Sequence, residues 1–248
     1  HAGGEGVWGE MFWAAVQSAA LVCSDSDDLI DIGLAMIPPW SRIARVIRHV
    51  RYCLQHQAGE GVPRGVIQEG DTWGQTRESI KHWFGHAHPC HAVQNHGVTI
   101  LGWLLGADFG DALCKAVNCG CDTDCTGATL GATLGILNGL EGIPQTWREP
   151  VGEDIVLHDY TKVGRTDNLP CTVTALSERI VDLLPRLRPD HPFAQAGVLE
   201  VERADLYDNS TVAPLWRTDL RQSETRLGGR RVTLMFPAGP VYRADTDM

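Results

Sequence analysis

Two aspartates near the middle of the chain form the pattern best suited to chemistry. Asp122 and Asp124 lie two residues apart, and the glycine-striped segment 127–135 follows almost directly. Carboxylate oxygens are the ligands that hard divalent cations prefer. Because side chains at i and i+2 diverge on a helix, the pair can converge only if Asp122 precedes the first helical turn and Asp124 lies within it. The spacing therefore predicts half of a hard-cation site at a helix N-terminus.

Two other interpretations of this segment remain open from the residues alone. Both aspartates could simply cap the helix and favour the positive end of its dipole. The nearby Cys119, Cys121 and Cys125 also suggest a zinc or iron–sulfur site. A fourth ligand at a suitable spacing is missing, and the interleaved aspartates suit harder cations, so the sequence favours the hard-cation hypothesis.

The composition restricts the class of protein. The chain has 248 residues, 43% hydrophobic and 21% charged, with a net charge of −10. This excess of acidic residues argues against nucleic acid as a partner, since phosphate binding relies on clustered Lys and Arg. No apolar run reaches the roughly 20 residues that a membrane span requires. Eight cysteines without a dense disulfide framework favour reduced thiols and a cytoplasmic location. The oligomeric state is left open.

The elements that must position the aspartates are predicted to be helices. Apolar residues recur at helical spacing over residues 8–22, 26–37, 41–54, 77–84, 92–105, 108–118, 123–140 and 172–187. The glycine-rich segment 57–74 is expected to be a loop. Three glycines in the helix after Asp124 cost about 3 kcal/mol relative to alanine, which indicates close approach along one face. The body is therefore predicted to be an all-α multi-helix bundle.

The pattern changes after residue 189. Residues 198–207 and 231–235 alternate as strands do, and Leu227 to Arg230 resembles a hairpin turn. The predicted organisation is an all-α domain over residues 1–189 and a small β-rich C-terminal segment over residues 190–248. Fewer than 60 residues make a weak core of their own, so this segment is expected to lean on the helical body.

A second cluster of metal-binding residue types lies at 86–91. It contains His86, His88, Cys90 and His91, but its spacing matches no zinc motif. The sequence favours a solvated loop that leads into the helix carrying Asn95.

An ordered set of short motifs resembles the ADP-ribosylglycohydrolase family over residues 3–188. The central motif is segment 118–129, in which an Asp-Thr-Asp run leads into an alanine- and glycine-rich helix. The supporting motifs keep the family's order: Gly6, Gly9 and Met11, then Ile37 and Pro38 with Ser41 and Arg42, then Asn95, then Leu104 to Gly106 with Asp108 and Phe109, and finally Gly142 to Pro144 with Trp147.

The resemblance implies an all-α hydrolase with a two-magnesium site. It would cleave ADP-ribose from a modified protein side chain or a related acceptor, at the anomeric carbon of the ribose. Asp122 and Asp124 would be the catalytic metal ligands, followed at the next metal position by Cys125, where the family often has Thr or Ser. A thiol is a poor magnesium ligand, so either Cys125 turns away or the metal preference changes.

The resemblance also implies which residues meet the substrate: Gly6, Gly9, Met11, Ser41 and Asn95. The glycines could present backbone N–H groups to the pyrophosphate, although a flexible terminus is the alternative. Ser41 could instead cap a helix, and Asn95 could bond to backbone rather than ligand.

The chain departs from the family in one large respect. Members carry an N-terminal half with a Gly-Asp-rich segment and a Thr-Asp-Asp run that completes the metal site, and Asp25 to Asp28 stand in the wrong order for that role. We therefore expect a piece of a longer protein. The alternatives to a hydrolase of ADP-ribose linkages are a non-catalytic ADP-ribose-binding or structural relative, and a hydrolase of another nucleoside or glycoside conjugate.

Overall fold

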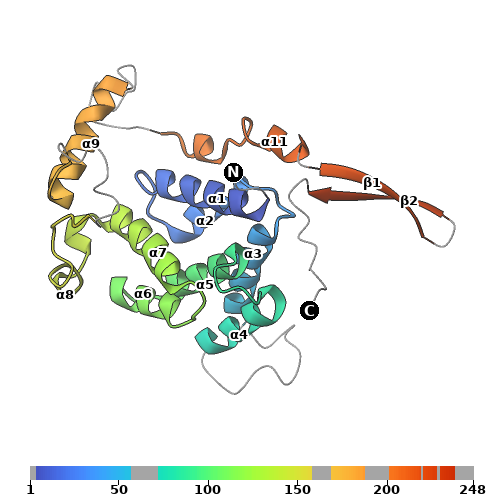
Figure 1. The fold of residues 1–248 in the computed structure, drawn as a ribbon, viewed down its shortest axis with the longest axis horizontal. Coiled ribbons are helices and arrows are strands. Elements are labelled where there is room, and N and C mark those ends of the chain that lie inside the picture. The colour runs from blue at the N-terminus through green and yellow to red at the C-terminus, as the bar shows by residue number, and fades with distance from the viewer. Residues whose placement is uncertain are drawn as a thin grey trace. The chain divides into compact units, whose positions relative to one another are not determined.

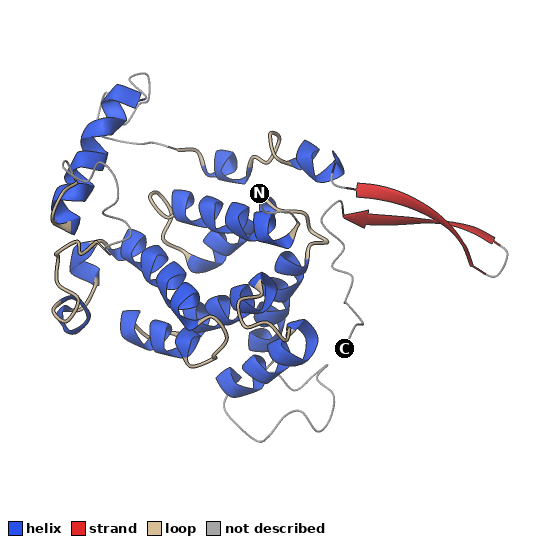
Figure 2. Cartoon of the chain, viewed as in Figure 1, coloured by secondary structure: helices blue, strands red, loops and turns tan. Residues whose placement is uncertain are grey.

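Helices dominate the part of the chain that the computed structural model describes (Figure 2). The described residues are 4–56, 72–157, 169–187, 201–218, 220–227 and 230–237. Contacts divide the chain into two compact units, the first formed by His1–Gly142 with Glu202–Met248 and the second by Ile143–Val201. The predicted domain boundary between residues 189 and 190 lies outside the described residues.

Within its described residues, seven helices build the body of the first unit, which Figure 1 labels α1 to α7. They are α1 (Glu5–Ala19), α2 (Ser26–Ala35), α3 (Arg42–Gln55), α4 (Thr72–Phe84), α5 (Ala92–Leu105), α6 (Phe109–Val117) and α7 (Thr123–Asn138), followed by the short 3-10 turn η1 (Leu140–Gly142). The all-α prediction is confirmed. The start of α1 differs from its prediction, because the helix begins at Glu5 rather than at residue 8 and includes Gly6.

Helix α5 forms the centre of this unit. It packs against α1, α3, α4, α6 and α7, and Figure 1 shows it between them. Ten of its residues are buried, on every side of the helix. Glycine lets two neighbours come unusually close: a Cβ at Gly97 would lie 2.6 Å from Val46, and one at Gly102 would lie 2.6 Å from the Cβ and N of Ala116. Close packing on all sides therefore fixes α5, and with it the positions of the polar side chains that it carries.

The glycine stripe of α7 faces α6 less tightly than the sequence suggests. A Cβ at Gly127 would lie 3.2 Å from Val117, and one at Gly131 would lie 3.7 Å from Leu113, which is an ordinary contact. The close approach predicted from the α7 glycines is therefore modest, and Gly97 and Gly102 of α5 make tighter helix contacts than the glycines of α7 do.

The segment after residue 201 returns to the first unit along α2. It contains the 3-10 helix η3 (Arg203–Tyr207) and the helix α11 (Ala213–Thr218). Arg203 pairs with Asp28 at 2.5 Å, and Asn209 Nδ2 donates to the Ala35 carbonyl at 2.8 Å. The prediction of a strand over residues 198–207 is wrong for 203–207, because side-chain alternation in so short a segment does not distinguish a strand from a 3-10 turn. Residues 198–200 lie outside the described residues.

A two-stranded antiparallel hairpin follows this segment. Strand β1 (Leu220–Leu227) pairs with β2 (Arg230–Pro237), and Leu227 lies opposite Arg230. The predicted hairpin is therefore confirmed, with residues 228 and 229 of its turn outside the described range.

The second unit contains the short helix α8 (Gln145–Arg148) and the helix α9 (Val173–Leu187). A β-bridge between Asp154 and Thr172 joins the two parts of this unit. Within the described residues of both units, no helix is both long and apolar enough to cross a membrane.

The first unit is expected to lose stability in mild acid, because it buries His96. Burial lowers the pKa of His96, an effect that its hydrogen bond to the Ala92 carbonyl at 2.7 Å only partly offsets. The unfolded chain, with a histidine pKa of about 6.5, binds the proton first as the pH falls. The free energy of unfolding should therefore decrease below about pH 6.5, by up to about 1.4 kcal/mol per pH unit for this group.

Urea unfolding of the wild type at about pH 7.5 and about pH 5.5 measures this dependence. The variant His96→Gln should show a smaller loss over the same interval, and His82→Gln, at an exposed position, should behave as the wild type. An unaltered pH dependence in His96→Gln would contradict the assignment. His49, whose pKa burial also lowers, accounts for part of the slope that remains.

Candidate metal centre

A tight reversal between α6 and α7 places Asp122 at the start of α7. Gly120 and Cys121 both adopt positive φ angles, of 80° and 69°. For cysteine this left-handed conformation is uncommon and is maintained only where the surroundings fix it. Arg77 of α4 helps to do so, because its Nε donates to the Cys119 carbonyl at 2.9 Å. The loop that carries the first aspartate is therefore held from a second helix.

Asp122 occupies the N-cap position of α7 but does not cap the helix. At the N-caps of α2, α3 and α6, the side chains of Asp25, Ser41 and Asp108 each accept a hydrogen bond from the backbone N–H three residues later, at 2.9, 3.1 and 2.9 Å. The Asp122 side chain makes no such bond. The capping interpretation is therefore wrong for Asp122, whose carboxylate is left available to a ligand.

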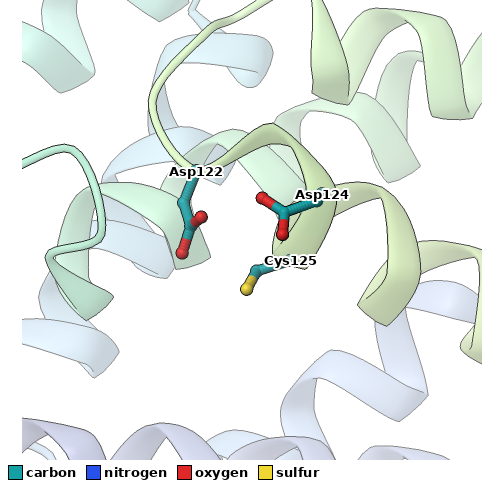
Figure 3. A group of neighbouring side chains, drawn as sticks. All are labelled: Asp122, Asp124 and Cys125. Atoms are coloured by element: carbon teal, nitrogen blue, oxygen red, sulfur yellow. The ribbon is translucent and has the colours of Figure 1, made fainter. Parts of the chain in front are cut away.

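Asp122, Asp124 and Cys125 instead converge with one another. Their ligand atoms all lie within 4.8 Å of each other, with Asp122 partly exposed and the other two exposed. Figure 3 shows Asp122 on the approaching loop and the other two in the first turn of α7, with the side chains directed into the same space. The arrangement predicted from the i, i+2 spacing is thus present in the structure. A carboxylate pair of this kind can bind a hard divalent cation.

Asn95 joins this loop to the central helix. Its Oδ1 accepts the Asp122 N–H at 3.1 Å, while its Nδ2 donates to the carbonyls of Pro89 at 2.7 Å and His91 at 3.0 Å. Asn95 is only 8% exposed, so all of its hydrogen-bonding groups in this environment serve the protein itself. The side chain therefore positions Asp122 relative to the loop before α5.

The same loop brings a second thiol beside the aspartates. Desolvation, together with a hydrogen bond to Asp122 and the charges of Asp122 and Asp124, raises the pKa of Cys90. A hydrogen bond from its thiol to Asp122, reinforced by the carboxylate charges, raises the pKa of Cys125. The carboxylates of Asp122 and Asp124 therefore oppose ionisation of both thiols.

The other cysteines of the central motif do not join this group. Cys119 is fully buried, and its thiol lies 3.2 Å from the Lys115 carbonyl. Burial raises the pKa of Cys119 to about 12, which makes it unsuited to metal binding. The three-cysteine hypothesis of the sequence therefore has no support in the geometry.

The residues predicted to meet the substrate have structural roles near by. Gly9 packs against His96, whose ring would lie 2.6 Å from an added Cβ, and Ser41 is buried and caps α3. Gly6 lies in the first turn of α1, and Met11 packs against the core. Together with Asn95, these residues keep their substrate-binding assignment as a prediction.

Two contributors to this region were missed by sequence reasoning. The sequence predicted a solvated loop around Cys90. Cys90 lies five residues before Asn95, so its proximity to Asp122 could have been predicted once Asn95 was assigned to the site. Glu5 caps α3, since its Oε1 and Oε2 accept the N–H groups of Arg42 at 2.8 Å and Ile43 at 2.9 Å. No local pattern indicates that contact, because 37 residues separate the partners.

The all-α fold and the Asp-x-Asp pair at the start of a small-residue helix define a candidate metal centre. A model of the ADP-ribosylglycohydrolase family matches residues 1–185, most of the 248-residue chain. The chain therefore belongs to the ADP-ribosylglycohydrolase family. Searches of curated proteins and of solved structures gave no match. Membership in the family supports hydrolysis of ADP-ribose linkages in general, and with it ADP-ribosylated substrates.

Proposed function

We propose that Asp122 and Asp124 bind Mg²⁺ in a hydrolase that cleaves ADP-ribose from a modified protein side chain or a related acceptor. The observation that carries the proposal is the uncapped carboxylate of Asp122. Three other N-caps of the same unit use their side chains to satisfy the helix, whereas Asp122 turns its carboxylate towards Asp124. The missing cap costs about 1 kcal/mol. Proteins accept such a local cost most often at functional sites, which supports a ligand role for this carboxylate.

The donor atoms fit a hard cation in part. The two carboxylates supply the oxygen ligands that Mg²⁺ prefers, and waters or substrate oxygens usually complete its octahedral shell. The Cys125 thiol lies within 4.8 Å of both carboxylates, but a thiol is a poor ligand for Mg²⁺. The family's two-metal arrangement would need further ligands for a second Mg²⁺. Among the described residues, Asp122, Asp124 and Cys125 are the one group of potential metal ligands that lie together.

The proposed reaction breaks the bond at the anomeric carbon of the ribose. A bound divalent cation would act as a Lewis acid that orients sugar hydroxyls and lowers the pKa of a water molecule. The chain's own contribution is positional: Asn95 and the Gly120–Cys121 reversal hold Asp122, and the first turn of α7 holds Asp124. Positive charge from the cation and the α7 dipole would favour an anionic substrate here.

Replacing Asp122 by asparagine tests the proposal. Because the Asp122 side chain makes no cap hydrogen bond, Asp122→Asn should keep its melting temperature while losing ligand charge. Calorimetric titration with ADP-ribose should show the Mg²⁺-dependent affinity falling by about 10-fold or more. Asp108→Asn is the matched control, since Asp108 is an N-cap that does cap its helix, and its Mg²⁺-dependent affinity should not change. Unchanged binding in Asp122→Asn would overturn the proposal.

The composition of the group favours one second candidate, a non-catalytic ADP-ribose-binding relative. Two carboxylates and a thiol are fewer ligands than a two-metal centre uses. Measurement of released ADP-ribose separates the candidates: binding that depends on Mg²⁺ without turnover by the intact gene product would support the second.

A further inference from the structure

The outer face of α3 carries a row of arginines in a chain that is acidic as a whole. Residues 32–59 contain four Arg and no Asp or Glu, whereas the whole chain has a net charge of −10. Arg42, Arg45 and Arg48 are exposed, and their spacing of three residues makes them neighbours on the helix surface. These three residues, here called the arginine row, concentrate positive charge at one place.

The inner face of α3 is what holds the helix in the first unit. Ile43, Val46, Ile47 and Val50 are fully buried in the hydrophobic core. The exposed arginines take no part in this packing. Their charge is therefore not explained by the stability of the fold.

Two residues of the arginine row occupy positions that a helix disfavours for cations. Arg42 and Arg45 lie in the first turn of α3, which contains no acidic residue. The positive end of the helix dipole lies in that turn, so positive side chains there are unfavourable. The first turns of α2 and α6 instead contain acidic residues, Asp27 and Asp28 in α2 and Asp111 in α6. Proteins accept such local costs most often where a residue serves a function.

Among the described residues, no acidic side chain forms an ion pair with the arginine row. The next arginine of α3, Arg51, is paired with Asp27 at 3.1 Å and with Asp31 at 2.5 Å. Glu5 reaches the start of α3, but both of its carboxylate oxygens accept backbone N–H groups there. The guanidinium groups of the row are therefore left for a partner from outside.

Side chains in and beside the row are held in place. Arg48 Nη1 donates to the Pro39 carbonyl at 2.7 Å, which orients the guanidinium and leaves its remaining N–H groups for a ligand. Tyr52, one turn after Arg48, is 42% exposed. Trp40 is 45% exposed and packs edge-on against Trp216, with ring centroids 6.4 Å apart. Arg, Tyr and Trp are the residue types that carry most of the binding energy in protein interfaces.

We propose that the arginine row is a docking surface for an acidic segment of a partner protein. A planar guanidinium binds a carboxylate through two parallel hydrogen bonds, so Asp and Glu side chains fit this surface. The row covers about 9 Å of the helix axis. Alternate residues of an extended segment lie about 7 Å apart, so neighbouring arginines can bind two carboxylates of one segment.

The charge of the rest of the chain makes this docking specific. An acidic segment is repelled by a protein of net charge −10 and attracted where unpaired arginines concentrate. The row contains none of the predicted metal or substrate ligands, so the inference goes beyond the proposed function and does not depend on it.

Fluorescence anisotropy with a labelled octaglutamate peptide tests the surface. The full chain should bind the peptide without Mg²⁺, and the affinity should fall by about fivefold or more between about 50 mM and about 300 mM salt, because exposed ion pairs are screened. In Arg45→Gln/Arg48→Gln the affinity at low salt should fall by about fivefold or more. Glutamine is close to arginine in helix propensity, so α3 should be retained, which circular dichroism checks.

The matched control is Arg179→Gln/Arg186→Gln, which removes two exposed arginines from α9. Its affinity for the peptide should change by less than about twofold, because these charges lie outside the row. Absence of peptide binding by the wild type, or equal affinity in the two double variants, overturns the proposal. Tighter binding of a single-stranded oligonucleotide than of the peptide also overturns it, since the row would then be a nucleic-acid surface. None of these outcomes bears on the metal centre, because no metal is present in the assay.

Discussion

The variant Gly102→Ala is expected to destabilise the first unit by about 2–3 kcal/mol. Gly102 lies where α5 meets α6, and an added Cβ would stand 2.6 Å from both the Cβ and the backbone N of Ala116. The obstructing atoms belong to a helix backbone that cannot rotate away, so the two helices would have to separate. Because α5 also carries Asn95, the displacement should reach the candidate site.

The same substitution at Gly131 provides a matched control with the opposite sign. Gly131 lies within α7, where a Cβ would meet Leu113 at an ordinary 3.7 Å. Alanine there should raise the free energy of unfolding by about 0.5–1 kcal/mol, because it lowers the entropy of the unfolded chain. Urea unfolding of both variants measures the difference. If Gly102→Ala and Gly131→Ala had the same free energy of unfolding, α5 and α6 would not be packed as closely as described.

The variant Asn95→Ala is expected to lower both stability and metal affinity. It would leave the Asp122 N–H and the carbonyls of Pro89 and His91 without their partner, at a cost of about 3 kcal/mol. Loss of the link to Asp122 should also weaken divalent-cation binding by about 10- to 100-fold, as removal of a residue that positions a ligand typically does.

Calorimetric titration with Mg²⁺ and thermal unfolding measure the two effects of Asn95→Ala separately. Asn138→Ala is the control, because Asn138 is an exposed helical asparagine that makes one side-chain bond, to the Leu134 carbonyl. It should change stability by less than about 1 kcal/mol and leave cation affinity unchanged. Full cation affinity in a folded Asn95→Ala would show that Asp122 is positioned without Asn95.

The fold class followed from local patterns. Segment 92–105 carries apolar residues at helical spacing, and α5 has these bounds in the structure. The start of α1 was harder to predict, since glycines at positions 4, 6 and 9 disfavour a helix by propensity alone. Tertiary contacts override that propensity: Gly9 fits against His96, and Glu5 caps α3 from the first turn of α1. Tertiary packing therefore decides where α1 begins, and composition alone does not indicate that residue.

The candidate site was likewise predicted from the sequence only in part. The spacing of Asp122 and Asp124 was enough to predict their convergence, because only a loop-to-helix junction allows it. The resemblance to the ADP-ribosylglycohydrolase family was enough to suggest the function, and the family match over residues 1–185 bears out the membership. Cys90 could not be assigned in this way, since 32 residues separate it from Asp122 and its own neighbours suggest a histidine cluster.

The sequence by itself determined the helical class, the family and the two carboxylates, since these depend on local spacing and on motifs in a fixed order. Only the tertiary structure decided that Asp122 leaves its helix uncapped, that Asn95 accepts the Asp122 N–H, and that Cys125 lies beside the two carboxylates. Hydrogen-bond partners and desolvation depend on segments distant in sequence, and they are set only when α5 packs against its neighbours.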